Sequence, residues 1–255
     1  MRQRVLFVLT ALLGLAGIAP QHPEETAFEI GSGGRETRTH VAFETPPGIV
    51  SASIRIVVDR TANVGLNFFA LQVDFDNGTW AHGGLQDVNG PDGPQGPRVR
   101  QVNWGGLVDR GGGDADYDEA DAPADLEKIQ NPPTGQHVGP YAWKTGVEYE
   151  YLIERGRRVT LPPGNYSLTP GDDPVHLRRS RRMWEWRFTV RPVSAPGEPF
   201  VAVLYDAADA IDTLSVWNEA GYGSSDAEQQ TRWTRPRYRV RDEDGERTPA
   251  SWQRF

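Results

Sequence analysis

Four aspartates in one acidic stretch have the types and spacing of ligands for a hard cation. In this stretch, positions 1, 3, 5 and 12 of the calcium-loop pattern are occupied by Asp114, Asp116, Asp118 and Asp125. In that pattern a curling backbone turns successive carboxylates toward one ion. Glu119 stands at the sixth position, where the turn requires glycine, and the last ligand is aspartate instead of glutamate. The stretch therefore predicts either a calcium site of altered geometry, with calcium as the one expected cofactor, or a solvated acidic loop.

A second charged stretch is basic and runs from Arg178 to Arg182, with Arg155, Arg157 and Arg158 earlier in the chain. Guanidinium groups pair with planar anions through two parallel hydrogen bonds, so this cluster could hold phosphate, sulfate or uronate groups. It could equally pair with the acidic stretch through exposed ion pairs, or flank the tryptophan-rich strand that follows as a guard against aggregation. The sequence leaves its role open.

Complete catalytic signatures are absent from the sequence. The chain has no Cys, which excludes a thiol nucleophile, disulfides and thiolate zinc. It contains neither the H-E-x-x-H nor the G-x-S-x-G motif, and it lacks the E-x-D-x-x-E spacing of sandwich-type glucanases. The five histidines are scattered along the chain. The sequence therefore favours a binding protein over an enzyme and leaves catalysis open.

Aromatic residues are the most suggestive candidates for ligand binding. The chain has 8 Trp, 8 Tyr and 9 Phe. Sugars present flat C–H faces that pack on aromatic rings, while amide and carboxylate side chains bind their hydroxyls. Tryptophan also fills cores, which is the better interpretation of Trp184 and Trp186 because both alternate with charged residues. Trp80, Trp104 and Trp217 are open to either interpretation.

A turn signal at Asp76–Thr79 decides which of these groups share a face. A two-residue turn would place polar and apolar side chains together on one face. A three-residue loop with Gly78 in the left-handed conformation pairs Asp74 with Trp80 and Gln72 with His82 instead. Because a slip of one residue exchanges the faces, the second register gives one wholly apolar face, and this consistency favours it.

The opposite face of this hairpin is the predicted ligand site. This face combines aromatic rings with hydrogen-bonding groups, and Trp104 of the following strand is added as a further candidate. The predicted ligand-binding residues are Phe68, Gln72, Asp74, Trp80, His82, Gln86 and Trp104. The alternative is that another strand or loop covers this face and makes it a second small core.

The elements that must position these groups are strands. The 28 Gly and 20 Pro interrupt the chain too often for long helices. Apolar and polar residues alternate at period two, which predicts strands at 53–59, 68–75, 147–154 and 184–191, and further strands at 39–45, 99–108, 200–205, 211–218 and 236–241. Short strands with one apolar face each predict an all-β fold, an antiparallel two-sheet β-sandwich. A Gly/Pro loop is expected at 87–98 and an acidic loop at 109–135.

Charged side chains also predict one strand pairing. Glu148 and Glu150 alternate against one apolar face, and Arg187 and Arg191 alternate against another. Opposite charges stabilise neighbouring antiparallel strands, so these two strands should be close neighbours in one sheet.

The N-terminus has the pattern of a secretory signal peptide over residues 1–19. Arg2 and Arg4 precede an apolar run from Val5 to Ala19 that is shorter than the ~20 residues of a membrane-spanning helix. Cleavage after Ala16 or Ala19 is left open, and a retained anchor is the alternative. We expect a secreted single domain over 20–255 with no membrane span after cleavage. The net charge of −8 disfavours nucleic acid as a partner.

Four segments resemble the concanavalin-like jelly-roll superfamily: FFALQVDFDNGTWAHGGLQ, VNWGGLVDRGG, YAWKTGVEYEYLI and MWEWRFTV. Within it the pattern is similar to a secreted family, domain of unknown function 3472. In that family a strand ending in G-L-Q or G-I-Q precedes a strand with a prominent Trp, and a W-x-x-G-x-x-Y strand follows. The matching positions here are Gly84-Leu85-Gln86, Trp104, Trp143, Gly146 and Tyr149. The resemblance implies a jelly-roll fold and a link to carbohydrate processing, and it carries no catalytic residues.

Together these observations lead to the expectation of a secreted, monomeric β-sandwich that binds a polysaccharide or another glycan. One alternative is a polysaccharide lyase or glycoside hydrolase on the same scaffold, in which His82 or Tyr149 would act as a base near Arg178. The other is a structural or protein-binding module without a sugar site.

Overall fold

The computed structural model describes residues 28–33, 37–90, 96–105, 129–130, 138–166, 175–177, 180–194, 196–221 and 228–254, and every regular element in these ranges is a β-strand. The strands are β1 (Phe28–Gly33), β2 (Thr37–Glu44), β3 (Ile49–Arg60), β4 (Leu66–Phe75), β5 (Trp80–Asn89), β6 (Arg98–Gly105), β7 (Ile129–Gln130), β8 (Val138–Pro140), β9 (Glu148–Leu161), β10 (Gly164–Tyr166), β11 (Val175–Leu177), β12 (Arg181–Pro192), β13 (Phe200–Asp206), β14 (Ile211–Gly221), β15 (Glu228–Val240) and β16 (Ser251–Arg254). The expected all-β fold is confirmed.

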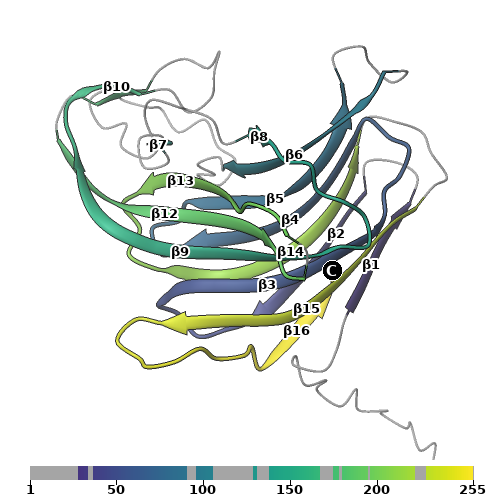
Figure 1. Ribbon diagram of the computed structural model, residues 1–255. Helices are drawn as coiled ribbons and strands as arrows, with labels where there is room; N and C mark the ends of the chain where they lie inside the picture. Colours follow the sequence, from purple (N-terminus) through teal and green to yellow (C-terminus); the bar gives the residue numbers. More distant parts are fainter. Residues whose placement is uncertain are drawn as a thin grey trace, which may run out of the picture.

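Fourteen of the strands form one curled antiparallel sheet, and β10 pairs with β11 separately. One run of neighbours is β1-β15-β3-β9-β12-β13-β7, and the other is β16-β2-β14-β4-β5-β6-β8. The runs are linked where Ile211 of β14 pairs with Ile49 of β3. Figure 1 shows the long central strands lying side by side and bending in the same direction. Within the described ranges, no helix is long and apolar enough to cross a membrane.

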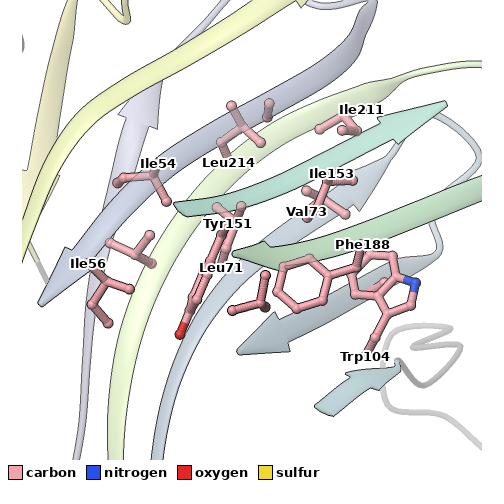
Figure 2. Close-up of a cluster of buried hydrophobic side chains, with 14 of the residues drawn as sticks. Ile54, Ile56, Leu71, Val73, Trp104, Tyr151, Ile153, Phe188, Ile211 and Leu214 are labelled. Carbon is pink, nitrogen blue, oxygen red and sulfur yellow. The ribbon is translucent and has the colours of Figure 1, made fainter. Parts of the chain in front are cut away.

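The core cluster draws its residues from the apolar sides of both runs. The row predicted on β4 is buried, with Phe69, Leu71, Val73 and Phe75 each exposed by 2% or less. Figure 2 shows Tyr151 of β9 and Phe188 of β12 pointing toward Leu71 and Trp104 of the other run. The period-two alternation therefore identified the buried side of these strands.

Tyr151 connects the two runs with its hydroxyl at the centre of the core. The Tyr151 hydroxyl donates to the Phe69 carbonyl at 3.0 Å and accepts a hydrogen bond from the Leu85 amide at 2.9 Å. Burial is the main reason why the pKa of Tyr151 lies well above its usual value, because desolvation disfavours the phenolate. The hydroxyl thus remains protonated and able to donate.

Replacing Tyr151 with phenylalanine is expected to lower the free energy of unfolding by about 2–3 kcal/mol, because two buried backbone groups lose their partner. Chemical denaturation of the wild type and the variant measures the difference. Tyr205→Phe is a suitable control, since Tyr205 is also nearly buried, at 6% exposed, but does not belong to this core cluster. Equal stability of Tyr151→Phe and the wild type would contradict the assigned role.

The β4–β5 hairpin has the predicted three-residue loop. Gly78 donates to the Phe75 carbonyl at 3.0 Å, and Phe75 donates to the Thr79 carbonyl at 2.7 Å. Gly78 has a φ of 83°, which is the left-handed conformation that glycine adopts without strain. The loop aligns Asp74 with Trp80 and Gln72 with His82, so the predicted register is confirmed.

The predicted pairing of the strands at 147–153 and 184–191 is also confirmed. In the β9–β12 pair, Arg191 lies opposite Glu150 and Arg187 lies opposite Glu154. The Arg191 Nε donates to Glu150 at 2.6 Å, and Arg187 approaches Glu154 at 3.5 Å. Glu148 instead approaches Arg55 of β3, because β9 lies between β3 and β12.

Several segments for which the sequence predicted a loop or a separate role either differ from that prediction in the structure or lie outside the described residues. β5 continues to Asn89, inside the expected Gly/Pro loop, because Arg98 binds the buried Asp87 at 2.6 Å and the Asn89 side chain at 3.1 Å. The expected signal peptide and the four aspartates of the calcium pattern lie outside the described residues, as do Arg178 and Arg179. Within the acidic loop, residues 129–130 form β7, which pairs with β13.

Candidate ligand-binding face

One side of the β2-β14-β4-β5-β6 run points away from the core and carries most of the predicted site. Residues directly opposite each other in a sheet share a face, and the registers align Phe68 with Gln86, Gln72 with His82, and Asp74 with Trp80. The neighbouring strands add further rings and amides to this face. We call it the mixed face and define it by His40, Phe68, Gln72, Asp74, Trp80, His82, Gln86, Gln101 and Trp217.

Five aromatic rings form a continuous array on the mixed face, with His82 at its centre. The ring centre of His82 lies 5.0 Å from Trp80, 5.3 Å from Phe68 and 5.4 Å from Trp217. Trp217 also lies 5.0 Å from Phe68 and 5.7 Å from His40. These distances are typical of contacting aromatic pairs, so the rings support one another's orientation.

One part of the array is buried and another part is accessible. Phe68 and Trp217 are only 3% and 4% exposed, and they form a small apolar cluster with Ala70. Trp80 and His82 are partly exposed. Phe68 and Trp217 therefore form a second small cluster, whereas Trp80 and His82 lie at the surface.

A chain of polar contacts lies beside the exposed rings. The Trp217 Nε1 donates to the Gln72 amide oxygen at 3.1 Å, and the Gln72 amide nitrogen donates to Asp74 at 3.2 Å. The Thr213 hydroxyl donates to the other oxygen of Asp74. Asp74 and Gln72 are both partly exposed. The chain fixes which end of the Gln72 amide faces each neighbour, so this acceptor and donor pair is pre-oriented.

Gln86 is on the mixed face but is buried. The Gln101 amide nitrogen donates to the Gln86 side-chain oxygen at 2.8 Å, and the indole of Trp143 donates to the Gln86 carbonyl at 2.8 Å. Only 7% of Gln86 is exposed. Its contacts support the strands below the face, and little of it can touch a ligand.

Trp104 lies on the opposite side of its strand from the position expected for a ligand-binding residue. It pairs with Gly83 on the core side, is fully buried and stacks on Phe188 at 5.2 Å. Its indole nitrogen donates to the Trp186 carbonyl at 3.2 Å. This placement removes Trp104 from the candidate ligand site.

Trp217 and His40 belong to the array although neither was among the predicted site residues. They enter it because β14 pairs with β4 and β2, so that Trp217 lies beside both Ala70 and His40. The alternation of the strand at 211–218 could have placed Trp217 on one of its two faces. It could not have shown which strands flank β14.

The two candidate bases of the lyase alternative lie on different sides of the strands. His82 lies on the mixed face, whereas Tyr149 lies in the core, where its hydroxyl accepts a hydrogen bond from the Lys144 amide at 2.9 Å. Burial raises the pKa of Tyr149, which is opposite to what a phenolate base requires. Arg178 lies outside the described residues.

Metal ligands do not cluster in the part of the chain that the structure describes, where no three His, Cys, Asp or Glu side chains are arranged to hold an ion. The aspartates at 114–125 lie outside that part.

A scan against models of known protein families finds no match for this chain, and neither does a search of the curated proteins. The function of the protein must therefore be inferred from the geometry of the mixed face.

Proposed function

We propose that the protein binds a glycan through the exposed end of the mixed face. The observation that supports this proposal is the partly exposed Trp80–His82 ring pair beside the pre-oriented Gln72 and Asp74 side chains. A sugar ring can pack its C–H face on the indole while its hydroxyls bind the amide and the carboxylate. Trp80 is the proposed stacking platform, and Asp74 and Gln72 are the proposed hydroxyl-binding groups.

The charge of this surface favours a neutral glycan. Asp74 is the ionisable carboxylate beside the exposed rings, and the chain as a whole carries a net charge of −8. A carboxylate repels uronate and sulfate groups but accepts hydrogen bonds from hydroxyls. We therefore propose neutral polysaccharide chains as the ligand class of the mixed face.

For the fold, we propose a two-sheet jelly-roll sandwich. This interpretation is supported by the link between the two strand runs at the Ile211–Ile49 pair and by the core cluster that draws residues from both runs. Two sheets packed through apolar faces account for such a core. Export by a signal peptide at residues 1–19 and a monomeric state are proposed from the sequence alone.

Retention on insoluble polysaccharides tests the function. Trp80→Ala is expected to weaken retention at least tenfold, which corresponds to about 1.4 kcal/mol, because the stacking platform is removed. Its melting temperature should stay within about 4 °C of the wild type, since Trp80 is partly exposed and a change of about 1 kcal/mol shifts melting by that amount. Trp252→Ala is the matched control, because Trp252 packs against the edge of the core.

The same incubations separate the alternatives. New reducing ends or unsaturated sugars in the supernatant would replace the binding proposal with a hydrolase or a lyase. A protein that is neither retained nor releases product would contradict a sugar function. Retention that is unchanged in Trp80→Ala would place the binding site elsewhere on the molecule.

A further inference from the structure

The outer side of the other strand run has a shallow hollow that the proposed glycan site does not use. β15, β3, β9 and β12 lie side by side there (Figure 1). The hollow has a volume of about 270 Å³ and is lined by side chains of all four strands and by Glu246. A second hollow of about 170 Å³ adjoins the same segment of β15 and shares Arg235 and Arg237.

The registers of the four strands explain the depression. Ser53 of β3 and Leu152 of β9 are directly opposite each other, and Thr189 of β12 lies beside Leu152. The adjacent row, by contrast, carries the long side chains of Arg55, Glu150 and Arg191. Short side chains beside long ones leave a recess whose floor is a hydroxyl and an aliphatic group.

Arg55 and Arg191 of the lining lie beside carboxylates. The carboxylate of Glu150 binds Arg191 through one oxygen, at 2.6 Å from its Nε, and approaches Arg55 through the other at 3.7 Å. Arg55 also approaches Glu148 at 3.5 Å. Arg235 makes no ion pair within the described part of the chain, and Glu246 is exposed at the rim. β15 contributes two further guanidinium groups to the lining, those of Arg235 and Arg237.

Arg235 adopts a backbone conformation that its residue type disfavours. Its φ is 53°, and it directly precedes Pro236. A left-handed conformation is uncommon for a residue with a Cβ, and proline restricts the preceding residue to extended conformations. Such strain persists where the surroundings or the function require it. Glycine would adopt this conformation without strain.

The strain accompanies a β-bulge that turns arginines outward. The register with β3 shifts between Thr234 and Arg237, so β15 has one extra residue there. The bulge allows Trp233 and Tyr238, five positions apart, both to face the core. It also places Arg235 and Arg237 together on the outer side, at the hollow. A glycine would serve the bulge alone, whereas an arginine at this position also supplies a cation.

We propose that this hollow is an oxyanion-binding site, in which Arg235 and Arg237 hold the carboxylate or sulfate group of an acidic sugar. The sugar ring lies over Leu152 and Ser53. Guanidinium groups match the geometry of both anions, and the aliphatic floor suits the C–H face of a ring. The site is on the opposite side of the molecule from the mixed face and does not depend on the function proposed there.

Calorimetric titration at constant ionic strength tests the site with sodium glucuronate, sodium acetate and sodium sulfate as probes. Glucuronate is expected to bind, and Arg235→Gln should weaken its binding at least tenfold. Arg239→Gln is the matched control, because Arg239 is on the same strand and the same side but outside the hollow. It should change affinity less than twofold.

The substitution Arg235→Gly separates function from folding. It removes the guanidinium and relieves the backbone strain, so the melting temperature should rise by about 2–4 °C while glucuronate binding is lost. If no anion binds, or if Arg235→Gln and Arg235→Gly bind like the wild type, the proposal is overturned. Equal affinities for acetate and glucuronate would overturn its sugar part. Glucuronate binding that only Trp80→Ala abolishes would assign the anion to the mixed face instead.

Discussion

Replacing Trp104 with alanine is expected to destabilise the protein by about 3–5 kcal/mol, the range for removing a buried tryptophan from a core. Trp104 is fully buried, stacks on Phe188 and donates to the Trp186 carbonyl at 3.2 Å. The substitution therefore leaves a large cavity and removes the indole hydrogen bond to a buried carbonyl. Chemical denaturation followed by intrinsic fluorescence measures the loss.

The control for this prediction is Trp80→Ala, which removes an equally large side chain from the partly exposed end of the mixed face. Its free energy of unfolding should fall by about 1 kcal/mol or less, within the usual range for surface substitutions. Similar losses in the two variants would show that Trp80 is as structural as Trp104. That result would remove the main support for the glycan site.

The different roles of these two tryptophans could not be read from residue type. Trp80 follows a turn whose length could be predicted, because only one register left an apolar face unbroken. Trp104 follows the stretch at residues 87–98, for which no such constraint exists. Its side of the strand is set by pairing with Gly83. Because glycine has no side chain, the alternation of apolar and polar residues along β5 does not reveal which face Gly83 shares with Trp104.

The strands themselves were largely predictable, and their misplaced boundaries have local causes. A strand was expected at 236–241, whereas β15 begins at Glu228. The bulge at Arg235 and Pro236 breaks the period-two pattern, and proline in a strand is usually a sign that the strand has ended. Similarly, β9 continues to Leu161 through a register shift opposite Trp184 and Trp186.

Two tryptophans of β12 that were expected together on the buried face do lie on the core side of the strand, because the extra residue is in β9 and the pairing of β12 with β13 is unbroken. Trp186 is fully buried, whereas Trp184 is partly exposed and carries the guanidinium of Arg155 at 4.3 Å from its ring centre. The Trp184 indole also donates to Asp209 at 2.6 Å. Strict alternation therefore assigned both rings to the correct side of β12, but it does not indicate how deeply each ring is buried.

The short motifs that carried the family resemblance have structural roles in this fold. The Leu85 amide donates to the Tyr151 hydroxyl, and the Gln86 carbonyl accepts a hydrogen bond from the Trp143 indole. Gly146 has a φ of 75° in the turn that follows Trp143. These contacts join β5 to β9 and to the segment before it. They explain the residue types without requiring a catalytic role for any of them.

Gly84 is the motif position at which substitution should have one of the largest effects. A Cβ at this residue would lie 1.9 Å from the carbonyl oxygen of Phe69, which belongs to the backbone of β4. Because backbone cannot rotate away as a side chain can, β4 and β5 would have to separate locally. We expect Gly84→Ala to lower the free energy of unfolding by about 3 kcal/mol, at the upper end for overpacking substitutions.

Gly78→Ala is the matched control for Gly84→Ala within the same hairpin. A Cβ at Gly78 would meet nothing within 4 Å, but its φ of 83° is strained for alanine, so the expected loss is about 1–2 kcal/mol. The comparison thus separates a steric clash between strands from conformational strain in a turn. If Gly84→Ala is no less stable than Gly78→Ala, β4 and β5 do not approach each other at Gly84 as closely as described. Because Gly84 lies between the pairs Phe68–Gln86 and Gln72–His82, such a result would also undermine the register that assembles the mixed face.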